Sequence, residues 1–123
     1  IDSPADRVYL NADTLKGLTP ASEKQIKNDV HKANNYLNTA GISLRGVAYH
    51  LWNVKQELYA ARKNKPTGWN AFLKSGAMNC SPRFAQDLVG AHESYLHVLF
   101  LLWEQKEYRK KIEQKSLTRF NSD

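Results

Sequence analysis

The sequence predicts an all-α fold, a compact bundle of about four to five helices with a central helix-turn-helix and a long C-terminal helix. Apolar residues recur in several segments at the spacings of three and four that a helix requires. Prolines and glycines stand mostly where these segments end, and no apolar–polar alternation is long enough to build a sheet. With 123 residues, the chain is expected to form a single domain over residues 1–123.

The N-terminal part leads from an irregular segment, residues 1–18, into two amphipathic helices. The first helix begins with Thr19 as N-cap and Pro20 in its first turn, and its apolar residues continue to about position 39. Gly41 is expected to cap its C-terminus. Ser43 is expected to cap the second helix, which ends at Pro66. This helix has the most regular apolar stripe in the chain, formed by Leu44, Val47, Leu51, Val54 and Leu58.

The central stretch, residues 68–88, has the outline of a helix-turn-helix. Its first short helix carries the apolar residues Trp69, Phe72 and Leu73. Residues 76–80 form the connection, and Ser81 with Pro82 opens the second helix as N-cap and first-turn proline.

The last helix is predicted from residues 91–115, which contain neither proline nor glycine. Gly90 is expected to separate or bend it from the preceding helix. Its middle, residues 96–103, is almost entirely apolar and is therefore expected to be enclosed by the fold on most sides. Tyr108 and Ile112 extend an apolar stripe towards a tail at 116–123 that is expected to fray. This stripe suggests a homodimer through the C-terminal helix.

The net charge of +6 lies in the C-terminal two thirds of the chain. Residues 1–42 hold five basic and five acidic side chains, whereas the remainder holds thirteen basic and seven acidic ones. A basic face that begins at Arg45 favours an anionic partner, above all DNA. The alternative is a solvated, lysine-rich surface on a protein that has no such partner.

The composition also indicates in which cellular compartment the protein is expected. The longest apolar run, residues 98–103, is far shorter than the roughly 20 residues that a membrane span needs, so no membrane partner is expected. The single cysteine, Cys80, excludes an intrachain disulfide and favours a reducing compartment, hence a cytoplasmic protein. The chain starts at Ile1 without a basic and apolar leader, so no targeting peptide is expected.

The residue types used in catalysis do not form a recognisable set. His92 and His97 are five positions apart, whereas a zinc-protease helix needs histidines at i and i+4, so no metal site is expected. We expect Cys80 to fill the turn as a small apolar residue, and no glycine-rich phosphate loop is present. The chain is therefore expected to be non-enzymatic and without a cofactor. An enzyme would require His92, His97 and Cys80 to meet in one pocket.

The second helix of the helix-turn-helix carries side chains suited to DNA. The predicted core positions are Phe84, Leu88 and Val89. The positions then predicted to face outwards are Ser81, Arg83, Gln86 and Asp87. Arginine pairs with guanine and glutamine with adenine through two hydrogen bonds each. The predicted phosphate contacts are Lys74, Arg62, Lys63 and Lys65.

Three segments resemble an uncharacterised family of phage- and plasmid-encoded helix-turn-helix proteins. These segments are Leu51-x-x-Val54-Lys55-x-x-Leu58, Gly68-Trp69-x-x-Phe72-Leu73 and Ser81-x-Arg83-x-Ala85-Gln86-x-Leu88. The resemblance implies DNA binding in a mobile-element setting and nominates Arg83 and Gln86. The chain departs from the family pattern at Pro82 and Asp87 and in its long C-terminal helix.

Two functions from different classes follow. The leading hypothesis is a DNA-binding regulator or a replication or partition accessory factor of helix-turn-helix type. The rival is a protein–protein interaction module from a phage or bacterium, an inhibitor or assembly factor, in which the aromatic residues serve the core or an interface. These residues are Trp52, Tyr59, Trp69 and Trp103. Exposure of Arg83 and Gln86 beside Lys74 and Arg62 would favour DNA binding, whereas their burial would favour the interaction module.

Overall fold

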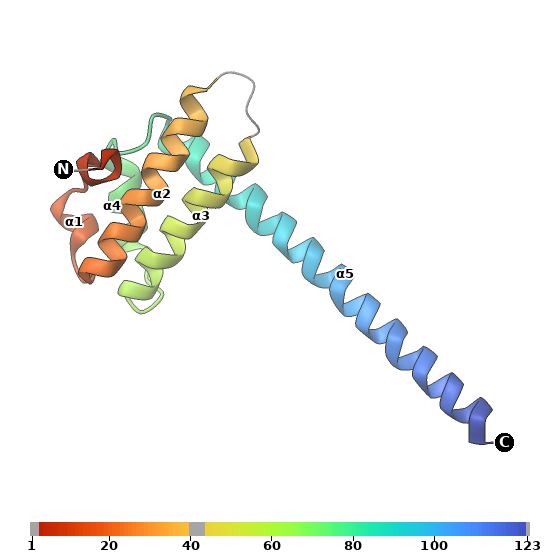
Figure 1. Cartoon of the computed structure of the whole chain (residues 1–123). Coiled ribbons are helices and arrows are strands. Elements are labelled where there is room, and N and C mark those ends of the chain that lie inside the picture. Colours follow the sequence, from red (N-terminus) through yellow and green to blue (C-terminus); the bar gives the residue numbers. More distant parts are fainter. Residues whose placement is uncertain (1–2, 40–43, 123) are drawn as a thin grey trace. The chain divides into compact units, whose positions relative to one another are not determined.

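The structure, a computed structural model, describes residues 3–39 and 44–122, with side chains described up to residue 115. The described part of the chain is helical with irregular connections and contains no strand (Figure 1). The prediction of an all-α fold is confirmed. The elements are the 3₁₀ helix η1 (Pro4–Arg7) and the α-helices α1 (Ala12–Leu15), α2 (Pro20–Asn38), α3 (Leu44–Ala61), α4 (Thr67–Lys74) and α5 (Pro82–Ser122).

The chain divides into two units, Ile1–His92 and Glu93–Asp123. The first unit contains every element up to α4 together with the first three turns of α5, and the second contains the rest of α5. The second unit contributes one helix, whose backbone reaches Ser122, within the tail that was expected to fray.

Helices α2 and α3 lie side by side and supply most of the core of the first unit (Figure 1). The Thr19 hydroxyl accepts a hydrogen bond from the Ser22 N–H at 3.1 Å, and Pro20 follows it in the first turn, as predicted for the start of α2. The predicted caps Gly41 and Ser43 lie outside the described residues. The core side chains from the two helices are Ile26, Val30, Ala33, Val47, Leu51, Val54 and Leu58.

The segment 1–18, predicted to be irregular, contains η1 and α1 and contributes to the core. Leu10 and Thr14 are buried. The Asn11 side chain caps α1 by accepting from the Thr14 N–H at 2.9 Å, and its amide donates to the Ala71 carbonyl of α4 at 3.4 Å. The N-terminal segment is therefore fastened to the bundle by both apolar and polar contacts.

The end of α3 lies earlier than predicted, at Ala61. Lys63 and Asn64 take left-handed backbone conformations with φ of 53° and 66°, and the Asn64 N–H donates to the Tyr59 carbonyl at 2.8 Å. A left-handed pair of this kind ends a helix without help from proline. Pro66 instead stands at the N-cap of α4.

The two helices predicted within residues 68–88 are both present, separated by residues 75–81. Ser81 caps α5, since its hydroxyl accepts from the Phe84 N–H at 3.1 Å, as predicted. Asn34 of α2 fixes the connection. Its side chain donates to the Ala77 carbonyl and accepts from the Asn79 N–H, each at 2.8 Å.

Two predictions about the C-terminal helix are wrong. First, Gly90 does not separate two helices, since α5 runs through it as one helix. A glycine within a helix costs only about 1 kcal/mol relative to alanine, which the surrounding residues can offset. Second, the apolar middle of the helix is exposed, because the second unit has no other described element to cover it.

Candidate functional site

The most unusual surface in the structure is the apolar part of the second unit. Seven large apolar side chains there retain between 43% and 57% of their full exposure. They are Tyr95, Val98, Leu99, Phe100, Leu101, Leu102 and Trp103. Helices that are apolar all round are normally buried. The apolar side chains of this segment therefore lack the apolar neighbours that normally cover such a helix.

The apolar side chains form two faces of the helix. The first, which we call the seam, follows steps of three and four and continues into the polar end of the helix. Its members are Val98, Leu101, Gln105, Tyr108 and Ile112. The second, which we call the aromatic face, is short and lies on the other side. Its members are Leu96, Leu99, Phe100 and Trp103. The rings of Phe100 and Trp103 are stacked with centroids 6.1 Å apart.

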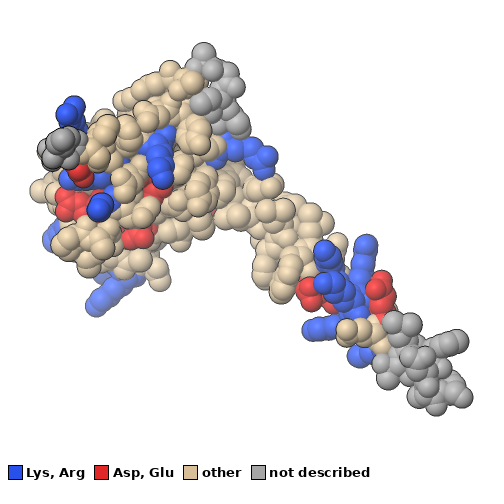
Figure 2. Space-filling view, viewed as in Figure 1, with Lys and Arg blue, Asp and Glu red and all other residues tan. Residues whose placement is uncertain are grey.

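Charged residues of both signs follow the apolar part of the second unit. Figure 2 shows blue and red side chains gathered along the helix after its tan stretch. Lys110 and Glu107, one turn apart, form an ion pair at 3.5 Å. The residues of this stretch outside the seam are all charged or polar: Glu104, Lys106, Glu107, Arg109, Lys110, Lys111, Glu113, Gln114 and Lys115. The seam is therefore the only apolar face that continues beyond Trp103 within the described side chains.

The residues predicted to contact bases lie on the first turns of α5. Ser81, Arg83, Gln86 and Asp87 are all exposed. The predicted core position Phe84 is wrong, since its side chain keeps 38% of its exposure, whereas Ala85 is buried. Ala85 and Val89 are one helical turn apart and share the inward face, while Phe84 points about a quarter of a turn away.

The predicted phosphate contacts have unequal roles in the structure. Lys63, Lys65 and Lys74 are exposed. The Arg62 guanidinium instead donates from Nε to the Lys16 carbonyl at 3.1 Å, from Nη1 to the Thr67 hydroxyl at 3.1 Å and from Nη2 to the Asp13 carbonyl. All three of its nitrogens are thus engaged in holding the N-terminal segment against α4.

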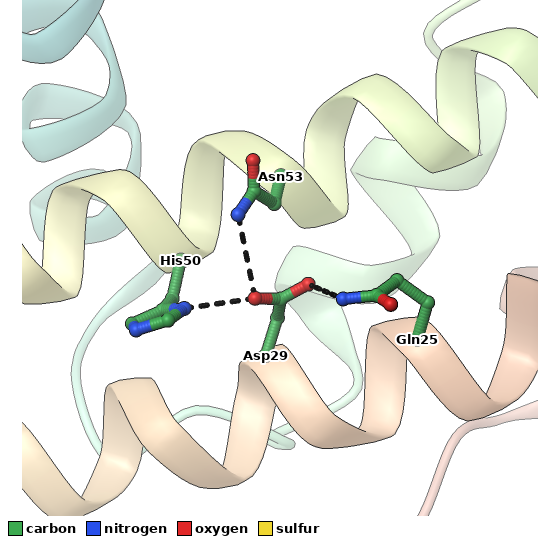
Figure 3. A network of polar contacts seen from close by, with 4 residues as sticks. All are labelled: Gln25, Asp29, His50 and Asn53. Carbon is green, nitrogen blue, oxygen red and sulfur yellow. Dashed lines mark hydrogen bonds and ion pairs between the residues drawn. The ribbon is translucent and has the colours of Figure 1, made fainter.

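A buried polar network in the first unit escaped the sequence analysis (Figure 3). Asp29 of α2 keeps only 2% of its exposure. Its Oδ1 lies 2.8 Å from His50 Nδ1 of α3 and accepts from the Asn53 amide at 3.4 Å, while Oδ2 accepts from the Gln25 amide at 2.9 Å. Both carboxylate oxygens therefore have partners, and the network joins α2 to α3.

His50 also belongs to a row of rings on α2, α3 and the start of α5. It stacks on Tyr36 with centroids 5.8 Å apart, and Tyr49 meets it edge-on at 5.2 Å. His92 lies 5.9 Å from Tyr49 and 5.4 Å from Trp52. These histidines are thus packed among aromatic rings. Such packing was not predicted, because it joins residues far apart in sequence.

Cys80 lies in the connection before α5, half-buried against the core. Burial raises the pKa of its thiol, which keeps it protonated and weakens it as a nucleophile. Within residues 3–39 and 44–122, no three histidine, cysteine or acidic side chains cluster in a way that could hold a metal ion.

No helix in the described part of the chain combines the length and apolar character needed to cross a membrane. Comparison with protein-family models, with curated proteins and with solved structures found no match to this chain. The two candidate surfaces are therefore weighed on their own chemistry.

Proposed function

We propose that this chain is a protein–protein interaction module that acts through residues 95–103 of α5. The observation that carries the proposal is the exposure of seven large apolar side chains on one short helical stretch. An aromatic side chain can bury about 150–250 Å² and an aliphatic one about 60–120 Å², so half of that for three aromatic and four aliphatic residues is on the order of 500 Å². The largest apolar patch on a typical monomer is about 300–600 Å² and is often functional.

The partner must supply an apolar surface. A groove on another protein that accepts a helix would bind such a stretch through residues at helical spacing. A second copy of the chain, joined through the C-terminal helix, is another partner of this kind. Charged residues on both sides of a partner groove would match the mixed charges of residues 104–115.

Site-specific photocrosslinking in the cells that produce the protein tests this proposal. A photoreactive analogue in place of Phe100 is expected to give a defined protein adduct, because this side chain lies in the aromatic face. The same analogue in place of Lys110, which is exposed among charged residues, is the matched control and is expected to give none. Absence of a protein adduct at position 100 from a chain that also stays monomeric, or equal labelling at both positions, would contradict the proposal.

DNA binding is the second candidate function, favoured by the exposure of Arg83 and Gln86 on the first turns of α5. The basic excess from Arg45 onwards and the resemblance to helix-turn-helix proteins of phages and plasmids support it. In this proposal α4 and the start of α5 act as the helix-turn-helix in a cytoplasmic regulator, and Lys63, Lys65 and Lys74 contact phosphates.

An electrophoretic mobility shift at low and moderate salt tests DNA binding. Arg83→Ala and Gln86→Ala are each expected to weaken binding to a specific site by about 1–3 kcal/mol. Lys24→Ala, at an exposed position of α2, is the matched control and is expected to have little effect. Arg62→Ala is unsuitable as a phosphate probe, because its loss would also release the N-terminal segment. A complete lack of binding at low salt would end this candidate.

A further inference from the structure

We propose that two copies of this chain pair through the seam as a parallel, in-register coiled coil over residues 95–115. This inference rests on the proposed interaction function and names a second copy of the chain as the occupant of one of the two apolar faces. The aromatic face stays uncovered in such a dimer and remains available to a different protein.

The seam has the spacing of a two-stranded coiled coil. Val98, Gln105 and Ile112 occupy the first core position of successive heptads, and Leu101, Tyr108 and Lys115 occupy the second. β-branched residues at the first position with leucine at the second favour two parallel strands. Gln105 adds a polar side chain at a core position, which fixes the register at some cost in stability.

The charges beside the seam suit parallel pairing. In a parallel dimer, the residue just before a first core position faces the residue five positions later in the other helix. Glu104 and Arg109 stand in this relation. Each Glu104 would therefore face Arg109 of the second copy, giving two ion pairs by symmetry. An antiparallel pair would not join these two positions.

The exposed apolar area of the seam limits how much surface the dimer can bury. Four apolar seam residues, together with Tyr95 and Leu102 beside them, are each 44–66% exposed. Their exposed apolar surface is on the order of 400 Å² per helix, counting about 150–250 Å² for each tyrosine and about 60–120 Å² for each aliphatic side chain. A standard stable interface buries about 800 Å² per partner. Because the seam offers less than this area, the dimer is expected to dissociate on dilution.

The side chains outside the seam, along residues 104–115, are also compatible with pairing to a single partner helix. The positions that would face solvent in the dimer are all charged or polar there. A third or fourth helix would cover more of the flanking side chains Glu104, Arg109 and Lys111, and burying these charges is costly. Two strands are thus the arrangement that covers the seam and leaves these charges in water.

Sedimentation equilibrium of the full chain over a wide concentration range tests the dimer. We expect a monomer–dimer equilibrium that Leu101→Asp or Ile112→Asp weakens about a hundredfold or more, since each places a charge in the seam. Phe100→Asp, on the aromatic face, is the matched control and should leave the equilibrium nearly unchanged. A monomer at every concentration, or equal effects of Leu101→Asp and Phe100→Asp, would overturn the proposal.

Charge exchange and crosslinking test the orientation. Glu104→Arg and Arg109→Glu should each weaken the dimer, and the double variant should restore it. Ile112→Cys in a Cys80→Ala background should form an intermolecular disulfide, because only parallel pairing brings the two position-112 side chains together. Failure of the double variant to recover, or no disulfide from a dimeric chain, would overturn the parallel arrangement.

The failure of the dimer can be told apart from the failure of the proposed function. A chain that stays monomeric but still crosslinks another protein from position 100 overturns the dimer and leaves the interaction module intact. A chain that stays monomeric and gives no adduct from position 100 overturns both.

Discussion

The two units of this molecule differ in the burial of their large apolar side chains. Leu51 in the first unit is fully buried, whereas Leu99 and Leu101 in the second keep 43% and 44% of their exposure. The amphipathic stripes of α2 and α3 meet each other within the chain. The apolar residues of the second unit belong to a single helix. Apolar side chains alone do not make a core, because at least two elements must supply them.

Polar groups differ between the units in the same way. In the first unit, Asp29, Arg62 and Asn34 each bind a partner on another segment of the chain. In the second unit, the one ion pair with a described distance joins Lys110 to Glu107 within the same turn. The first unit is therefore held together by contacts between segments, whereas this ion pair of the second unit lies within one helix.

The largest expected contrast concerns two leucines. Leu51→Ala should lower the free energy of unfolding of the first unit by about 2–5 kcal/mol, since it leaves a cavity in the core. Leu99→Ala should change it by no more than about 0.5 kcal/mol, because that side chain is already exposed. Urea unfolding, followed by circular dichroism at low protein concentration, measures both. Equal costs would show that residues 95–103 belong to the same core.

The next contrast compares a buried and an exposed aspartate. Asp29→Ala should cost about 1–3 kcal/mol of unfolding free energy, because it leaves the His50, Gln25 and Asn53 donors without their acceptor. Asp87→Ala, at an exposed position of α5, should cost less than about 0.5 kcal/mol. The same urea experiment applies. An unchanged unfolding free energy in Asp29→Ala would mean that the network does not stabilise the packing of α2 against α3.

A smaller effect is expected from the arginine that holds the N-terminal segment. Arg62→Lys should cost about 1 kcal/mol, because lysine cannot reproduce the three-nitrogen pattern towards Lys16, Asp13 and Thr67. Lys65→Ala is the control, since Lys65 is exposed. Hydrogen exchange of residues 12–18 reports the change directly. Unaltered exchange in Arg62→Lys would contradict the anchoring role.

The smallest effect concerns the thiol of Cys80, whose pKa is raised by burial. A raised pKa in the folded chain means that the protonated thiol contributes stability at lower pH, and that this contribution is lost as pH rises through the folded pKa. Alkylation of Cys80 should be slower in the folded chain than in the unfolded chain at mildly alkaline pH. Equal rates, after correction for exposure, would contradict a raised pKa.

The sequence predicted those features of the fold that depend on local residue patterns. The starts of α2 and α5 followed from Thr19, Pro20 and Ser81, and α3 followed from its apolar stripe. The end of α3 was misplaced, since proline is a visible stop signal whereas the left-handed pair at Lys63 and Asn64 is not.

Long-range relations escaped prediction. The contact between Asp29 and His50 depends on how α2 and α3 align, which their separate stripes do not specify. The apolar character of residues 96–103 indicated that these side chains would be buried. The sequence did not show whether other elements of this chain or another molecule would bury them. The candidate interaction surface became visible only when the structure showed a single helix in the second unit.

The central claim is that residues 95–103 are exposed and receive no apolar cover from the described part of their own chain. The emission of Trp103, obtained as the difference between the wild type and Trp103→Phe in dilute solution, tests this claim most directly. We expect red-shifted emission that acrylamide quenches almost as strongly as free indole, because Trp103 keeps 57% of its exposure and lies on the aromatic face. Blue-shifted emission that resists quenching in the monomer would contradict the claim.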